Sequence, residues 1–255
     1  MIVATSNVAV AAGITATPDS SLQDINVIAD GDYSSVFTDA LSGQVVIDMA
    51  FQAPLDIGYI ALGGTNIARK TSIKIETSIS LTGTPAVEII NDTLGSSESS
   101  VMMYKIDATA IKHVSITVTG VGSISIAEIA MGDYYEIPRG EQAGFQRPWS
   151  VPNIKARSSV GLDSSPVNLS YESRTLRTSI SVPNNIMADF DSGWYEFIRF
   201  AANNTFYVLE DGNKFHSYAG FNAVPAMTAA HSQTRTLGVS AVSFNAFAKS
   251  TEALF

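Results

Sequence analysis

Two aspartates and a serine share one short loop near the start of the chain. Asp30, Asp32 and Ser35 lie close together, with Gly31 between the aspartates. Carboxylate, hydroxyl and backbone oxygens are the ligands that a hard cation such as calcium takes. The loop therefore predicts a structural calcium site that fastens the loop and has no catalytic duty. The alternative is an ordinary turn, in which the aspartates hydrogen-bond to their own backbone.

The histidines and glycines form no motif that is typical of an active site. His113, His216 and His231 lie far apart, and none belongs to a His-x-Glu-x-His or His-x-x-x-His pattern. A triad can assemble from distant residues, but a lone histidine is more often structural. Gly63–Gly64 and Gly120–Gly122 lack the spacing and the lysine of a phosphate-binding loop. We expect no enzymatic activity; a hydrolase using two carboxylates of the second half is the third reading.

Composition and charge limit the classes of protein and partner. The chain has 255 residues, of which 45% are apolar and 15% charged, so it can bury one large or two ordinary cores. It has no cysteine, which excludes disulfides and thiolate metal sites. Its net charge is -9, and Arg69–Lys70 is its one adjacent basic pair, so we expect no nucleic-acid partner. Residues 1–7 have no basic segment and include polar residues, so we expect no cleavable signal peptide, and no apolar run reaches membrane-spanning length.

Alternating strands dominate the first half of the chain. Within Ser72–Thr77, Ile73 and Ile75 are expected inside, and Lys74 and Glu76 outside. Helical periodicity is missing before residue 135. We therefore predict an antiparallel, jelly-roll-type β-sandwich over 1–136. The predicted strands are Ile2–Ala11, Gln44–Phe51, Asp56–Leu62, Ser72–Thr77, Val87–Ile90, Val101–Ile106, His113–Val118 and Ser123–Tyr134.

A second β-rich domain is expected over 154–255. The stretch 137–153 contains three prolines and two glycines and reads as a linker between domains; the alternative is an ordinary long loop. Strand patterns follow at Val167–Tyr171 and Arg174–Val182, and Asp211–Gly212 marks a hairpin. The last predicted strand is Thr234–Ala248.

One helix is predicted in this second domain, near 191–202. Trp194, Phe197 and Ala201 are spaced so that they share one face of a helix. Asp191 or Ser192 is available as its N-cap.

Two groups of motifs, one near each end of the first half, occur in a recognisable order. Asp30–Phe37 reads Asp-Gly-Asp-Tyr-Ser-Ser-Val-Phe, and the strands Gln44–Met49 and Ile57–Leu62 follow. Lys112–Ile116 and Ile124–Ile129 close the region. This order resembles the discoidin-type family, also called F5/8 type C or galactose-binding-like, with Ser for the usual Thr and Phe for the usual Trp.

The resemblance implies a β-sandwich and adds a residue to the predicted calcium site. In the family, the Asp-Gly-Asp loop lies beside the glutamate of the closing strand, here Glu128. The implied ligands of a structural calcium are therefore Asp30, Asp32, Ser35 and Glu128. Because such sandwiches host several functions, the resemblance supports the fold more than any one role.

Members of the family that bind sugars use loops at one end of the sandwich. The corresponding loops here are Gly63–Arg69 and Leu81–Pro85, which supply Asn66 and Arg69 as predicted ligand-binding residues. Neither loop has the Trp or Tyr that would form an apolar platform for a sugar ring. The alternative is that Asn66 and Arg69 cap their loop and face solvent.

The second half, with strands, one helix, an Asp-Gly hairpin and a last strand, resembles the tube-forming domains of tailed-phage tail components, including distal tail proteins. It implies a structural subunit of a tail tip or baseplate, found in the virion. Such a subunit would assemble into a homo-oligomeric ring and contact other tail proteins. The alternative function is a carbohydrate-binding adhesion module that recognises cell-surface glycans.

Overall fold

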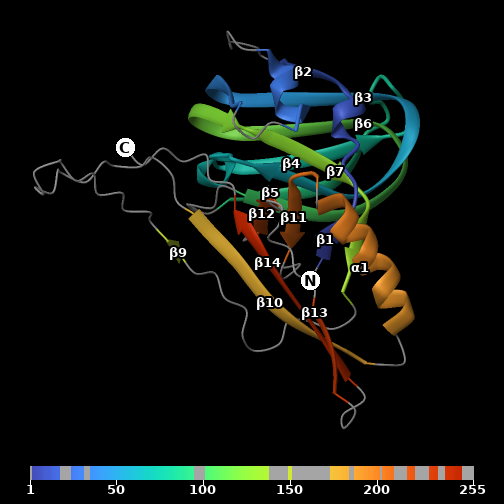
Figure 1. Ribbon diagram of the computed structural model, residues 1–255. Coiled ribbons are helices and arrows are strands. Elements are labelled where there is room, and N and C mark those ends of the chain that lie inside the picture. The colour runs from blue at the N-terminus through green and yellow to red at the C-terminus, as the bar shows by residue number, and fades with distance from the viewer. Residues whose placement is uncertain are drawn as a thin grey trace, which may run out of the picture.

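The computed structural model shows a mainly β protein with one α-helix (Figure 1). It describes residues 2–17, 24–31, 35–94, 101–137, 149–150, 173–183, 187–201, 203–209, 217–221, 230–234 and 239–248. The strands form two antiparallel sheets. The predicted fold class, an antiparallel sandwich followed by a β-rich part with one helix, is confirmed. Within the described ranges, no helix has the length and apolar character needed to cross a membrane.

The first sheet forms the sandwich. Its strand order is β2-β3-β6-β4-β5, and β7 pairs with β3. The bounds are Gly13–Thr17 for β2, Phe37–Gly63 for β3, Ser72–Ser78 for β4, Val87–Thr93 for β5, Val101–Ile126 for β6 and Glu128–Gly132 for β7. In Figure 1 these strands occupy the upper part of the view.

Strands β3 and β6 are longer than predicted, because β3 continues through one predicted break between strands and β6 through two. They pair from Phe37 with Ile126 to Gly63 with Val101, and the register shifts between Ala50 and Tyr59. Such irregularities bend a strand without ending it. The N-terminal part of β3 pairs with β2 and its C-terminal part pairs with β7, so one bent ladder contributes to both layers.

Alternating aliphatic side chains form the sandwich core. Ile73 and Ile75 are fully buried, whereas Lys74 and Glu76 are only half-buried, as the pattern of the sequence predicts. Each fully buried isoleucine contributes roughly 1.5–3 kcal/mol relative to an exposed one. The other strands supply further buried residues to the same core, including Val45, Ile47, Met49, Ile60, Leu62, Val114, Ile116, Val118, Ile129 and Met131.

The second sheet combines strands from both halves of the chain. Its order is β8-β1-β11-β12-β14-β10-β9, and β13 pairs with β14. The bounds are Ile2–Ala4 for β1, Tyr134–Glu136 for β8, Trp149–Ser150 for β9, Ser173–Pro183 for β10, Phe206–Leu209 for β11, Ser217–Phe221 for β12, Ala230–Thr234 for β13 and Val239–Ala248 for β14. In Figure 1, β10, β13 and β14 extend away from the sandwich.

The boundary between the sheets therefore does not follow the predicted division into 1–136 and 154–255. Strands β1 and β8 come from the first half but pair with each other, and β1 also pairs with β11. The predicted linker 137–153 lies outside the described residues except for Ile137 and β9. The division into two domains stays a prediction.

Three predicted strands have other forms. The predicted strand Ser123–Tyr134 is divided among the end of β6, the whole of β7 and the start of β8. The predicted strand Ile2–Ala11 ends at Ala4, and Ala9–Ala11 is a turn of 3-10 helix, because the chain leaves the second sheet to reach the sandwich. The predicted strand Thr234–Ala248 begins five residues later, as β14 from Val239. Thr234 is instead the last residue of β13, which pairs with β14. The predicted Val167–Tyr171 strand lies outside the described residues.

Helix α1 spans Met187–Ala201 and begins earlier than predicted. Asp191 and Ser192, the predicted N-caps, lie inside it. Met187 and Ala188 are good helix formers, so the helix continues toward the N-terminus beyond the amphipathic stretch that predicted it.

The buried face of α1 packs on β11 through aromatic residues. Trp194, Phe197 and Ala201 are buried, as their spacing predicts. The ring centroid of Phe197 lies 5.2 Å from that of Trp194 and 5.2 Å from that of Phe206, with the second pair edge to face. These contacts fix the helix against the second sheet.

A second core joins the two sheets. Tyr59 and Ala61 of β3 pack with Ile2 of β1 and with Tyr207 and Leu209 of β11. Neighbouring residues of β3, such as Ile60 and Leu62, face the sandwich core instead. This part of β3 is therefore buried on both faces, which holds the sandwich firmly on the second sheet.

Candidate functional site

The structure places the predicted calcium ligands in different surroundings. Asp30 ends a 3-10 helix at Ile25–Ala29, and Gly31 follows with a positive φ of 77°. Ser35 is half-buried, and Asp32 lies outside the described residues. Among the described residues, no three His, Cys, Asp or Glu side chains are grouped so that they could hold a metal ion. The calcium site stays a prediction.

Glu128 belongs to the junction between the two sheets. Its Oε2 accepts a 3.0 Å hydrogen bond from the hydroxyl of Tyr207, and its Oε1 accepts one of 3.5 Å from Nδ2 of Asn7. Glu128 is only 2% exposed. A buried carboxylate needs such donors, because its charge has lost its contact with water. Both oxygens therefore serve the junction, and a cation would have to compete for them.

The segment after β1 completes this junction. The hydroxyl of Tyr59 donates a 2.7 Å hydrogen bond to the carbonyl oxygen of Ser6, and the Ser6 hydroxyl accepts one of 2.7 Å from the backbone of Asp133. The Asn7 side chain accepts bonds from the backbone of Ala9 and Met131. Burial, and secondarily the charges of Glu128 and Asp133, raise the pKa of Tyr59 far above its usual range. The junction therefore favours the neutral, protonated form of the Tyr59 side chain.

Asn66, one of the predicted sugar ligands, replaces a missing strand at the edge of β6. Its Nδ2 donates a 3.0 Å hydrogen bond to the carbonyl of Ser123, and its Oδ1 accepts one of 3.0 Å from the backbone N–H of Ser125. A neighbouring strand would offer the same pair of groups. Asn66 therefore satisfies backbone groups of β6, and its role in ligand binding stays a prediction.

Arg69 and Lys70 lie next to this edge. Arg69 is exposed, at the end of a 3-10 helix over Ile67–Arg69. The ammonium of Lys70 donates a 3.1 Å hydrogen bond to the carbonyl oxygen of Val121. Burial, and secondarily the charge of Arg69, lower the pKa of Lys70. The ligand role of Arg69 is likewise still a prediction.

The two loops that were expected to form one sugar site lie at opposite ends of β4. Gly64–Thr71 precedes β4 and Ile79–Ala86 follows it, with Ser72–Ser78 between them. An extended strand of this length separates its ends by roughly 20 Å. The expectation of a shared site is therefore wrong, because both loops are connected by a single fully extended strand.

The loop between β4 and β5 carries a chain of hydroxyl groups. The hydroxyls of Ser80 and Thr82 lie 2.9 Å apart, and those of Thr82 and Thr84 lie 3.2 Å apart. The Ser78 hydroxyl accepts a 3.1 Å hydrogen bond from the backbone N–H of Ser80. Each hydroxyl has one donor and two acceptor positions, so the chain keeps capacity for a further polar partner.

Aliphatic side chains are exposed beside this hydroxyl chain. Ile79 is 65% exposed, Leu81 43% and Val87 57%. The resemblance to the discoidin-type family points to this loop through Leu81–Pro85, but the loop has no aromatic residue, and none of its side chains is among the predicted ligand-binding residues. Apolar and hydroxyl groups together are what a polar ligand with an apolar face needs.

The ring of His113 lies against the same loop, next to Gly83. Its Nε2 lies 3.5 Å from Oδ1 of Asp48, and its side chain is mostly buried. Gly83 has a φ of 73° and lies so close that an added Cβ would be 2.9 Å from Cε1 of His113. His113 was expected to be a structural residue of a strand, and the structure gives it this supporting position. His216 is outside the described residues, and His231 belongs to strand β13.

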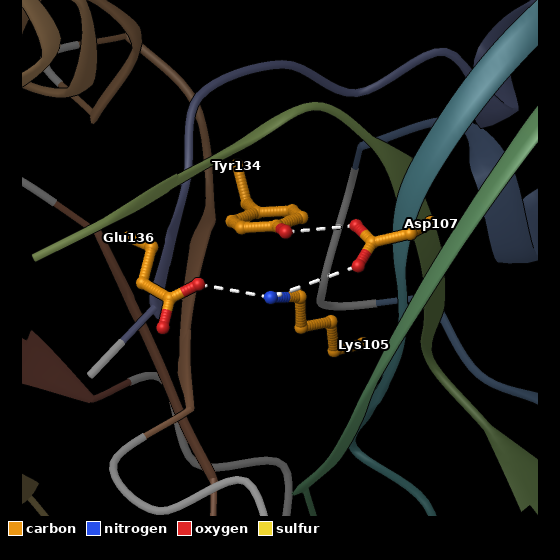
Figure 2. A network of polar contacts seen from close by, with 4 residues as sticks. All are labelled: Lys105, Asp107, Tyr134 and Glu136. Atoms are coloured by element: carbon orange, nitrogen blue, oxygen red, sulfur yellow. Dashed lines mark hydrogen bonds and ion pairs between the residues drawn. The ribbon is translucent and has the colours of Figure 1, made fainter.

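A second polar network lies between the sandwich and β8 (Figure 2). The ammonium of Lys105 lies 2.9 Å from Oε2 of Glu136, 3.6 Å from Oδ2 of Asp107 and 5.0 Å from the centre of the Tyr134 ring. The hydroxyl of Tyr134 donates a 2.8 Å hydrogen bond to Asp107. The bonds to Glu136 and then to Tyr134 raise the pKa of Lys105. The network is exposed and ties β6 to β8.

Comparisons with known proteins give similarity to solved structures over the N-terminal half. A CBM32 module from Clostridium perfringens, solved with GalNAc-β-1,3-galactose, is 18% identical, with a TM-score of 0.41, and covers 50% of this chain and 100% of its own. A chitosan-binding module from a Paenibacillus chitosanase/glucanase is 18% identical, with a TM-score of 0.45, and covers 50% and 99%. An F5/8 type C domain from Bacteroides fragilis is 14% identical, with a TM-score of 0.39, and covers 49% and 92%. No protein-family model and no curated protein matches the chain.

Proposed function

We propose that this protein is a non-catalytic glycan-binding protein, and that its sandwich contacts the glycan through the β4–β5 loop. One observation carries the proposal: the linked hydroxyls of Ser80, Thr82 and Thr84 lie in the same loop as the exposed side chains of Ile79 and Leu81. A sugar ring has the complementary surface, with hydroxyls at its edge and C–H groups on its faces.

The support beneath the loop favours a preformed site. Gly83 rests against the ring of His113, and that ring is in turn near Asp48. A loop held in one conformation loses little entropy when it binds a ligand, which favours affinity. The second sheet then acts as a rigid base for the sandwich, through the core shared by β3, β1 and β11.

A glycan array followed by calorimetry with the strongest ligand tests this function. We expect binding that Leu81→Asp and Thr82→Val each weaken at least ten-fold, because one adds a charge and the other interrupts the hydroxyl chain. Val121→Asp is the matched control, since Val121 is 82% exposed and lies beyond the other end of β4. An array without binding would remove the proposal.

The same experiment separates the two ends of the sandwich. Arg69→Ala changes an exposed arginine at the other end of β4, where the sequence predicts ligand-binding residues. We expect it to leave affinity unchanged. If Arg69→Ala abolished binding while Leu81→Asp did not, the glycan site would lie at the Asn66 end instead.

A second candidate is a ring-forming subunit of a phage tail tip or baseplate, contained in the virion and in contact with other tail proteins. It is favoured by the second sheet, in which β8 and β9 are the end strands and β10, β13 and β14 extend away from the sandwich (Figure 1). End strands can pair with those of a neighbouring copy. Light scattering and negative-stain microscopy at high protein concentration test it; a ring supports it, and a strictly monomeric protein counts against it.

A further inference from the structure

We propose that the β4–β5 loop selects uncharged saccharides and rejects acidic sugars such as uronic acids. This inference rests on the glycan-binding function proposed above and adds the chemical class of the ligand. It comes from the charges on the outer face of the sheet directly beside the loop.

Three carboxylates occupy one row across this sheet, and we call them the acid row: Asp48, Glu76 and Glu88. Asp48 pairs in register with Ser115, Ser115 with Glu76, and Glu76 with Glu88. The neighbours of Asp48 and Glu76 along their strands are buried in the core. Side chains alternate between the faces of a sheet, so the acid row points outward.

The cations near the acid row balance it only in part. The ammonium of Lys74 lies 2.8 Å from Oε2 of Glu76. Asp48 has His113 at 3.5 Å, which is charged only when protonated. Glu88 is exposed, and its Oε1 accepts a 3.2 Å hydrogen bond from the neutral side chain of Asn91. At neutral pH the row therefore keeps a negative charge.

The acid row lies close enough to the loop to act on a bound ligand. Ser78 pairs with His113 in the next outward-facing row, and the hydroxyl chain begins directly after it. Adjacent rows on one face are about 7 Å apart, which is within the screening length of roughly 10 Å at 0.1 M salt. A carboxylate on a bound sugar would be repelled, whereas a neutral sugar would not.

Matched pairs of sugars test the selection. We would titrate the protein with galacto-, gluco- and manno-oligosaccharides, and with the corresponding uronates, which replace the C6 hydroxymethyl group by a carboxylate. We expect each uronate to bind about five-fold more weakly than its neutral partner at low salt. The difference should shrink as the salt concentration rises, because salt screens the repulsion.

Two variants assign the effect to the acid row. Glu88→Gln should reduce the discrimination by about two-fold, whereas Glu196→Gln, an equal change on the exposed face of α1, should not alter it. Uronates that bind as tightly as their neutral partners, or a preference that ignores both salt and Glu88→Gln, would overturn this inference alone. Binding of neither class would overturn the glycan-binding function itself.

Discussion

The hydroxyl of Tyr207 donates a 3.0 Å hydrogen bond to the carboxylate of Glu128, and this bond joins the last strand of the sandwich to the second sheet. Both residues are buried, and they lie 79 positions apart in the sequence. The bond links the two halves of the chain in the same region as the core shared by β3, β1 and β11. Its removal is therefore expected to weaken the connection between the sheets.

Tyr207→Phe removes one donor from the buried carboxylate of Glu128. Since a hydrogen bond to a charged group contributes about 1.5–3 kcal/mol, we expect the free energy of unfolding in urea to fall by about that amount. Tyr195→Phe, at a tyrosine that is 62% exposed, is the matched control and should change stability by less than about 0.5 kcal/mol. A double-mutant cycle with Glu128→Gln should show coupling, and independent effects would contradict the assigned bond.

Tyr59 predicts a loss of stability at alkaline pH. Burial, then Glu128 and Asp133, raise its pKa far above the usual value of about 10. Above pH ~10 the unfolded chain releases this proton while the native state keeps it, so stability falls as pH rises. The contribution is fully present below that pH.

Tyr59→Phe should therefore flatten the alkaline decline in the free energy of unfolding, measured in urea from pH 8 to 11. At pH 8 it should cost about 1 kcal/mol, because the Ser6 carbonyl loses its donor. Burial also raises the pKa of Tyr104, so part of the decline should persist. If the free energy of unfolding of Tyr59→Phe fell as steeply with pH as that of the wild type, the ionisation of Tyr59 would not be the cause of the decline.

The sequence predicts local features of the fold better than its long-range pairings. The alternation around Ile73 and Ile75 and the spacing of Trp194 and Phe197 identify strand β4 and helix α1, because burial follows the period of the element. Gln52–Pro54 reads as a break between strands, yet the structure bends β3 there and continues it. A bulge tolerates proline, which hides the continuity.

The roles of the predicted site residues depend on contacts that no local pattern contains. Glu128 follows from a family motif, but its partner Tyr207 belongs to the other half of the chain. The sequence predicts Asn66 as a sugar ligand or as a loop cap, and only the geometry of β6 shows that its amide binds the backbone of Ser123 and Ser125. The hydroxyls of Ser80 and Thr82 are not predicted as ligand-binding groups, because their loop contains no aromatic residue.

Gly193 predicts a steric conflict between α1 and β8. A Cβ at this position would run into the ring of Tyr135. Gly193→Ala should therefore lower the free energy of unfolding by about 1–3 kcal/mol, although alanine gains about 1 kcal/mol in helix propensity. Ser192→Ala, on the exposed side of the same helix, should be neutral or slightly stabilising. Two equally stable alanine variants would argue against the close packing of α1 on β8.

Two glycine variants test whether the contact between Gly83 and His113 supports the β4–β5 loop. Gly83→Ala forces a Cβ against His113 at a positive φ of 73°, so the loop must move, and glycan affinity should fall at least ten-fold. Gly31→Ala is the matched control: its φ is 77°, but no described residue lies within 4 Å of the added Cβ. Gly31→Ala should lower the free energy of unfolding by about 1 kcal/mol, because of its positive φ, and should leave the affinity for the glycan unchanged. Calorimetry with the array ligand measures both, and His113→Ala in the Gly83→Ala background should restore part of the affinity. Full affinity in Gly83→Ala would mean that the loop does not depend on His113.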